Sequence, residues 1–148
     1  MKKDGKIVNH LKPVETKNPV QIEMAQWIDE YDPLPISGGW GYSKDDAVII
    51  ETNDPGIGIS LEYDFLEHRT MIELAEFSPH VCDVMSYQRI KQRVRIIDNI
   101  HYDIIESEVT VKWRNDDTVT TYHVEGWFNV EKLFETYSKI TEENKDVN

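Results

Sequence analysis

Two long segments rich in β-branched residues constrain the fold of this chain more than any other feature. They run from Val84 to Ile97 and from Ile100 to Trp113, and only Asp98 and Asn99 separate them. Asp and Asn tolerate the left-handed backbone conformation that a two-residue hairpin turn requires. The sequence therefore predicts a long antiparallel hairpin in which Ile97 faces Ile100.

This register also predicts which side chains share a face of the hairpin. Lys91 would face Glu106 and Arg89 would face Glu108, which makes cross-strand ion pairs. An aspartate at Val94, on the other face, would be a buried unpaired charge that costs more than ~3 kcal/mol. That other face is predicted to be the core face, and it carries Ile90, Val94, Ile96, Ile105, Val109 and Val111.

The composition favours further strands. The chain has 16 Ile and 13 Val against 6 Leu and 3 Ala, and β-branched residues suit pleated, half-buried surfaces. Ala47–Thr52 and the alternating segment Ile57–Phe65 flank Asn53-Asp54-Pro55-Gly56, a turn sequence, so we expect a second hairpin there. Thr118–Phe128 is expected to return beside the long hairpin as a third strand.

Three helices are expected around these strands. Asn18 and Pro19 are typical of the start of a first helix. After it, we expect irregular backbone from Pro33 to Tyr42. A second helix is predicted over Leu66–Phe77, and Asn129 is expected to cap a third. Apolar stripes are predicted on the first helix at Val20, Met24, Trp27, Ile28 and Tyr31, and on the third at Val130, Leu133, Phe134, Tyr137 and Ile140.

The element order α-β-β-α-β-β-β-α predicts an α+β fold, with a single antiparallel sheet of about five strands and helices packed on one face. A chain of 148 residues fits one domain over residues 1–148, with flexible ends at 1–16 and 141–148. No apolar run reaches the length of a membrane helix and the first residues lack a signal-peptide core, so we expect a cytoplasmic protein that contacts no membrane.

Charge and cysteine content narrow the function classes. The chain carries 28 acidic and 16 basic residues, a formal charge of −12, which argues against nucleic acid as a partner and favours a basic protein partner. One cysteine cannot build a disulfide framework or a cysteine-rich metal site. No cofactor, metal site or catalytic residue is predicted.

The glycine-rich loop 37–42 is the predicted partner-binding surface. It follows a helix and precedes a strand, the reverse of a phosphate-binding loop, so we expect it to expose Trp40 and Tyr42 to a partner. The alternative is that Trp40 fills the edge of the core. Large amphipathic rings beside carboxylates suit a cationic, partly apolar partner. Asp45 and Asp46 would supply those carboxylates.

Polar groups for an alternative small-molecule pocket are His101, Asp103 and His123. Two residues apart on a strand, an imidazole and a carboxylate share a face, and adjacent strands could bring the pairs together. No metal-ligand spacing accompanies them.

One strand carries a basic stripe of Arg89, Lys91, Arg93 and Arg95. The predicted register gives Arg89 and Lys91 acidic partners, so a solvated ladder of ion pairs is the main interpretation. Arg93 and Arg95 face Ile104 and Tyr102 instead, which leaves a patch for an anionic partner as the alternative.

In size and acidity the chain is similar to small bacterial immunity proteins and antitoxins, a resemblance that implies a noncatalytic protein able to neutralise or dock a basic partner. The element order also looks like the cone-shaped nuclear-transport-factor-like fold, whose curved sheet often encloses a ligand pocket. The last helix and the missing second N-terminal helix depart from that fold.

A DNA-mimicking inhibitor is a third class of function for an acidic protein. The short acidic runs and the basic strand argue against it.

Overall fold

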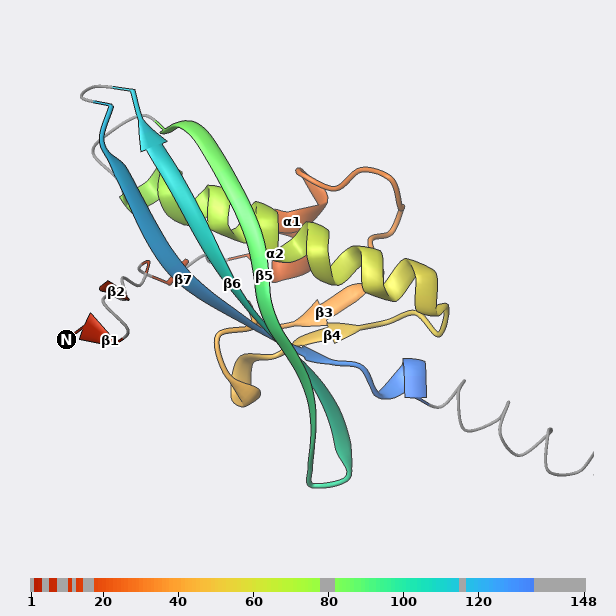
Figure 1. Cartoon of the computed structure of the whole chain (residues 1–148). Helices are drawn as coiled ribbons and strands as arrows, with labels where there is room; N and C mark the ends of the chain where they lie inside the picture. The colour runs from red at the N-terminus through yellow and green to blue at the C-terminus, as the bar shows by residue number, and fades with distance from the viewer. Residues whose placement is uncertain are drawn as a thin grey trace, which may run out of the picture.

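The computed structural model describes residues 2–3, 6–7, 11, 13–14, 18–77, 82–114 and 117–134. One five-stranded sheet with the strand order β3-β4-β7-β6-β5 forms its centre, and helix α2 crosses one face of it (Figure 1). This confirms the predicted α+β class with a single sheet. The strands are β3 (Ile36–Gly38), β4 (Val48–Ile50), β5 (Cys82–Ile97), β6 (Ile100–Trp113) and β7 (Val119–Asn129). The helices are α1 (Val20–Ala25), the 3₁₀ turn η1 (Lys44–Asp46) and α2 (Pro55–Phe77), and β1 (Lys2–Lys3) pairs separately with β2 (Lys6–Ile7).

The sheet is mixed, whereas the sequence predicted a purely antiparallel one. β4 runs parallel to β7, and Val48 lies opposite Phe128. The order of the main elements agrees with the prediction, since residues 131–134 are again helical after β7. β3 falls inside the stretch predicted to be irregular, where Ile36 pairs with Ile50 of β4.

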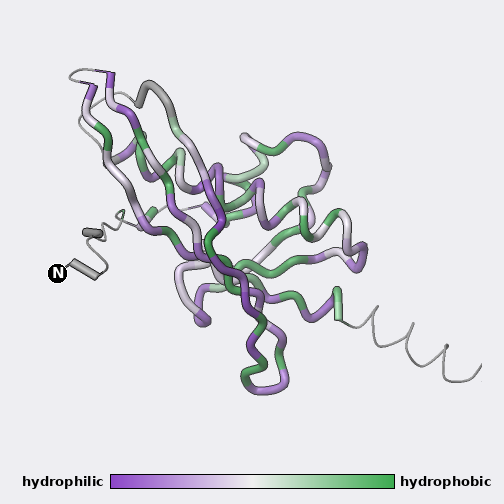
Figure 2. The backbone as a smooth tube through the Cα atoms, viewed as in Figure 1, coloured by the Kyte–Doolittle hydropathy of each residue, from purple (hydrophilic) through white to green (hydrophobic). Residues whose placement is uncertain are grey.

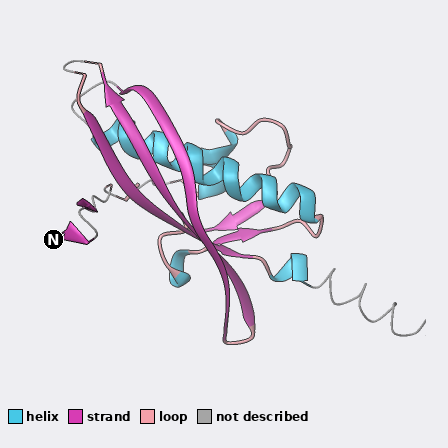
Figure 3. Ribbon diagram, in the orientation of Figure 1, coloured by secondary structure: helices cyan, strands magenta, loops and turns pink. Residues whose placement is uncertain are grey.

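The predicted hairpin over residues 47–65 is wrong, because its second arm is the first half of α2 (Figure 3). Asp54 caps this helix: its side chain accepts a hydrogen bond from the Ile57 amide at 3.1 Å and its carbonyl accepts one from Gly58 at 2.9 Å. Pro55 occupies the first helical position, where its missing N–H costs nothing. The sequence Asp-Pro-Gly is compatible with both a turn and a helix start, and the Asp54 cap favours the helix.

Burial along α2 repeats every three to four residues instead of every two. Ile59, which the strand interpretation placed in the core, is exposed on the outer side of the helix. Three of the buried residues are charged, namely Glu62, Arg69 and Glu73. The buried positions of α2 are Gly58, Leu61, Glu62, Phe65, Leu66, Arg69, Thr70, Glu73 and Leu74.

The long hairpin of β5 and β6 has the predicted register near its turn. Ile97 lies opposite Ile100 and Lys91 opposite Glu106, and both turn residues have positive φ. The register then shifts between Arg89 and Lys91, so that Arg89 faces Ser107 and not Glu108. This bulge inserts one residue and exchanges the two faces of β5 beyond it. Tyr87 and Met85 therefore lie on the face that packs against the core.

The predicted core positions Ile90, Val94 and Ile96 are wrong. Val94 is 51% exposed and Ile96 is 64% exposed, and Ile90 at the bulge is also exposed. Val94 and Ile96 do lie on the same face as Asp103 and His101, but they sit on the outermost strand, where the hairpin tip extends past α2 (Figure 1). The tip is alternately polar and apolar along the chain (Figure 2).

Because Val94 is exposed, replacing it with aspartate should reduce the stability of the protein only slightly. Water reaches this position, so the carboxylate stays solvated and the free energy of unfolding should fall by no more than about 1 kcal/mol. Urea unfolding of the variant measures this, and a loss above ~3 kcal/mol would restore the original assignment of Val94 to the core.

Helix α1 begins close to the predicted start, but Pro19 is its N-cap and no side chain caps it, and it ends at Ala25, well before Asp32 and Pro33. Val20, Met24 and Ile28 are buried as expected, whereas Trp27 is 49% exposed. After β7, Asn129 caps the helical residues 131–134 by accepting a hydrogen bond from the Glu131 amide at 3.1 Å. Val130 and Leu133 are buried, while Tyr137 and Ile140 lie outside the described residues, as do residues 141–148 and most of 1–16.

Candidate functional site

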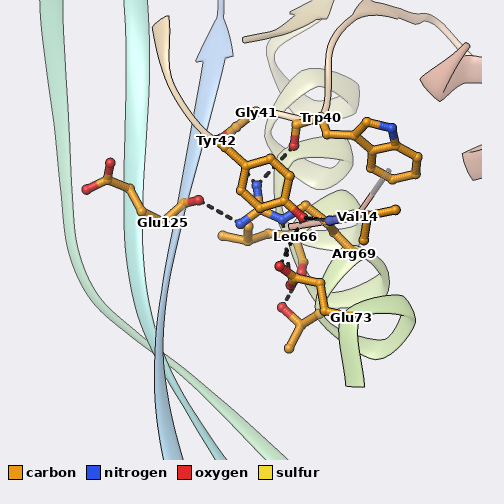
Figure 4. A network of polar contacts seen from close by, with 9 residues as sticks. Val14, Trp40, Gly41, Tyr42, Leu66, Arg69, Glu73 and Glu125 are labelled. Atoms are coloured by element: carbon orange, nitrogen blue, oxygen red, sulfur yellow. Dashed lines mark hydrogen bonds and ion pairs between the residues drawn. The ribbon is translucent and has the colours of Figure 1, made fainter. Parts of the chain in front are cut away.

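A fully buried arginine on α2 organises the interior beside the edge of β7 (Figure 4). Arg69 Nη1 donates to the carbonyl oxygens of Trp40 and Gly41 at 3.0 and 3.2 Å, and Nη2 donates to the carbonyl of Glu125 at 2.6 Å. The guanidinium carbon lies 4.2 Å from the centre of the Tyr42 ring. One side chain therefore ties α2, the loop before η1 and strand β7 together.

Glu73 completes this cluster one helical turn after Arg69. Its Oε1 lies 3.9 Å from Arg69 Nε, and its Oε2 accepts a hydrogen bond from the Tyr42 hydroxyl at 3.0 Å. The same hydroxyl accepts a hydrogen bond from the Val14 amide at 2.8 Å. Burial raises the pKa of Glu73, while Arg69 and the Tyr42 hydrogen bond act in the opposite direction. Burial also raises the pKa of Tyr42.

A small hollow of about 240 Å³ opens beside the cluster, and His123 and Glu125 line it together with Tyr42, Arg69 and Glu73. The polar atoms of Arg69 and Tyr42 are largely engaged with backbone groups and with Glu73. We therefore assign the Arg69 cluster to holding the fold together.

The residues predicted for partner binding are mostly engaged within the protein. Tyr42 belongs to the Arg69 cluster, and half-buried Trp40 packs against the core with its ring 6.0 Å from Phe65. Asp46 accepts hydrogen bonds from the Ser43 amide and hydroxyl at 2.6 and 3.1 Å, which caps η1. Asp45 is exposed, with Lys44 at 3.9 Å.

The predicted pocket residues do not come together. Strand alternation puts Asp103 on the face of β6 that carries α2, whereas His123 pairs with Glu108 on the opposite face. His123 Nε2 lies 3.8 Å from Glu106 Oε1. His101 shares the face of Asp103, but its Nδ1 lies 2.9 Å from Glu131 Oε2 and its ring stacks on Phe134 at 4.0 Å.

Asp103 instead forms a buried pair with Glu62 of α2. These side chains are 6% and 2% exposed, and Gln92 Nε2 donates to Asp103 Oδ2 at 2.7 Å. Arg89 donates to Gln92 Oε1 at 2.7 Å and also contacts the Tyr63 hydroxyl. Burial, followed by the hydrogen bond to Asp103 and its charge, raises the pKa of Glu62 to about 10. Glu62 is therefore protonated at neutral pH, which avoids a second buried negative charge beside Asp103.

A second hollow, of about 460 Å³, lies between α1 and the segment 29–34 that follows it, and we call it the acidic hollow. Its lining includes Ile22, Asp29, Tyr31 and Asp32. Asp29 and Asp32 are exposed, as is Ile22, and among the residues that the structure describes no cation pairs with either carboxylate. Residues 18–43 contain four acidic side chains and no Lys, Arg or His. Half-exposed Trp27 follows α1 and lies 6.2 Å from His68.

Sequence reasoning missed the buried charges because it treated residues 57–65 as a strand. In a helix from Pro55, residues Glu62, Arg69 and Glu73 fall on the same stripe as Leu66. Charged residues on an apolar helical stripe indicate buried, paired groups. That signal was present in the sequence once the helix start was placed correctly.

Searches of the described part of the chain for a membrane-spanning helix and for a metal site found neither. No helix there is long and apolar enough to span a membrane. No group of three or more His, Cys, Asp and Glu side chains there could hold a metal ion. Comparison with protein families, with curated proteins and with solved structures finds no match.

Proposed function

We propose that this protein is a noncatalytic binding protein that docks a basic, partly apolar segment of a protein partner in the acidic hollow. One observation carries the proposal: Asp29 and Asp32 line an open hollow with exposed Ile22, and no described cation neutralises them. A cationic side chain would reach the two carboxylates while an apolar neighbour covers Ile22.

Charge and shape support this occupant over others. Residues 18–43 around the hollow have only acidic charges, so a basic segment is attracted to the hollow and an acidic one is repelled from it. The floor of the hollow is firm, because Leu34 is buried and its carbonyl accepts a hydrogen bond from Gln21 Nε2 at 2.8 Å. A preformed surface loses little conformational entropy on binding.

The hollow replaces the loop at residues 38–42 as the proposed surface. In that loop Tyr42 and Asp46 already have partners within the fold, and half-buried Trp40 packs on Phe65. Groups satisfied in the free protein gain less from a partner than groups exposed to water. Asp45 is the exposed carboxylate of that loop region and serves as the comparison position.

Two single charge reversals test the proposal, namely Asp29→Lys in the hollow and Asp45→Lys on η1. The probe is a synthetic amphipathic peptide of alternating lysine and leucine clusters, titrated into isotope-labelled protein. Amide shifts should concentrate at residues 20–34, and Asp29→Lys should weaken binding at least about 10-fold through lost attraction and new repulsion. Asp45→Lys, which changes the net charge equally, should weaken it no more than about twofold.

The reverse ranking would contradict the hollow. If Asp45→Lys weakened binding more than Asp29→Lys, the surface would be the loop around Trp40 and Tyr42. If both variants reduced binding equally with shifts spread over the molecule, the attraction would be one of net charge alone, with no defined site.

A further inference from the structure

Strand β5 leaves a long edge of the sheet open. It pairs with β6 on one side, and no strand of the described residues pairs with it on the other. Such an edge presents unpaired backbone N–H and C=O groups, which another extended chain can bind.

The turn geometry shows which residues present those groups. Ile97 and Ile100 close a two-residue turn with positive φ at both central residues, and closing residues of this turn form a hydrogen-bonded pair. Hydrogen-bonded and non-hydrogen-bonded pairs then alternate along the hairpin. The backbone N–H and C=O of Gln92, Val94 and Ile96 therefore point away from β6 toward the open edge.

The side chains of this edge differ on its two faces. On the α2 side, Val94 and Ile96 are more than half exposed. On the opposite face lie Lys91, Arg93 and Arg95, opposite Glu106, Ile104 and Tyr102. Arg93 Nη1 lies 3.1 Å from Glu106 Oε2, whereas the structure gives Lys91 and Arg95 no partner among the described residues. The expected ion pair of Lys91 is thus made by Arg93, two residues further along the strand.

We propose that the open edge of β5 binds an acidic, extended segment of a protein partner as an additional strand. In that segment acidic residues would alternate with apolar ones, because opposed residues of paired strands share a face. The acidic side chains would meet Lys91 and Arg95, and the apolar ones would cover Val94 and Ile96. This surface is separate from the acidic hollow and takes a segment of opposite charge.

A second copy of β5 fits this edge poorly. Antiparallel self-pairing with Val94 opposite Val94 would place Arg93 opposite Arg95, and self-pairing with Val94 opposite Ile96 would place Arg95 opposite Arg95. Like charges directly opposed are destabilising. The negative charge of the whole chain does not exclude an acidic segment, since salt screens charges beyond ~10 Å at 0.1 M and the nearest charges are the basic ones.

The test uses the full chain and an acetylated eight-residue peptide in which glutamate alternates with valine. Isotope-labelled protein should show amide shifts along residues 91–97. Lys91→Glu/Arg95→Glu should weaken binding at least about 10-fold, and Lys44→Glu/Lys112→Glu, with the same change in net charge, no more than about twofold. The same peptide with lysine in place of glutamate should not shift these amides.

A proline tests the backbone part of the proposal. Val94→Pro removes an outward N–H that the β5–β6 ladder does not use, and an edge strand tolerates proline there. It should weaken peptide binding about 10-fold through one lost hydrogen bond, whereas Val94→Thr, which keeps the N–H and the β-branch, should bind within about threefold of the parent.

Three outcomes would overturn the proposal. They are the absence of shifts on β5 at millimolar peptide, equal binding by the Val94→Pro variant when its spectrum shows an intact fold, and a concentration-dependent dimer that pairs β5 with β5. The first would mean that the basic residues and the bulge only protect the edge from aggregation.

Discussion

Replacing Glu62 with glutamine is expected to stabilise the protein, and the gain is expected to grow as the pH rises. The carboxyl group of Glu62 ionises near its ordinary pKa of 4.5 when exposed to water, but it holds its proton up to a pKa of about 10 in the fold. Between these values the folded state binds more protons than the unfolded state. The free energy of unfolding therefore falls with rising pH by up to ~1.4 kcal/mol per pH unit.

Glutamine removes this dependence and keeps a donor toward Asp103. Comparing the variant with the parent by urea unfolding at pH 5.5 and 8.5 cancels the contributions of all other groups. The stability difference should shift in favour of the variant by about 3 kcal/mol between the two pH values, allowing for relaxation around the buried pair. Glu67→Gln, an exposed position on the same helix, should show a shift near zero.

A stability difference that does not depend on pH would contradict the raised pKa of Glu62. It would mean that water reaches Glu62 and that its pKa in the folded protein lies close to the ordinary value. The expected result would instead show that a carboxyl pair persists in the core at a cost to stability, a pattern that occurs at functional sites more often than elsewhere.

Replacing Arg69 with alanine is expected to cause the largest loss of stability among the changes considered. The substitution removes the Arg69 donor to the carbonyl oxygens of Trp40 and Glu125, one of two donors to the Gly41 carbonyl, and the cation beside Glu73. Removing one partner of a buried pair costs about 3–5 kcal/mol. Urea unfolding should show this loss, or the variant should be unfolded at room temperature.

A double variant separates the ion pair from the hydrogen bonds. Arg69→Met/Glu73→Gln removes both charges and restores apolar volume, so it should be more stable than Arg69→Met alone by about 1–2 kcal/mol. Amide exchange at Trp127, which donates to the Gly41 carbonyl at 2.8 Å, should accelerate in every variant that lacks Arg69. A loss below 1 kcal/mol for Arg69→Ala would show that water replaces the guanidinium freely.

Local signals in the sequence determined several parts of the fold. Asp98 and Asn99 supplied the positive φ values of the turn, and this set the register from Ile97 to Lys91. Asn129 marked the start of the helical residues 131–134. These features depend on residues that are close in sequence, so the sequence pattern contains the interaction that decides them.

The periodicity of residues 57–65 could not decide their state without the rest of α2. Leu61 and Phe65 fit a strand period of two and a helix period of four equally well. The helix is selected because Asp54 caps it and because its buried stripe continues for another two turns through Arg69 and Glu73. Packing across the whole length of α2 exceeds the preference of one nine-residue segment.

The candidate sites also depended on contacts between distant residues. Val94 keeps its predicted face but lies on the outermost strand, where the hairpin tip extends past α2, so a residue predicted to lie in the core became part of an exposed edge. Glu62 meets Asp103 and Arg69 meets the Glu125 carbonyl only because α2 crosses the sheet. A buried charge is tolerated only where a partner lies within a few ångströms, and that distance is set by the packing of helix on sheet and not by spacing along the chain.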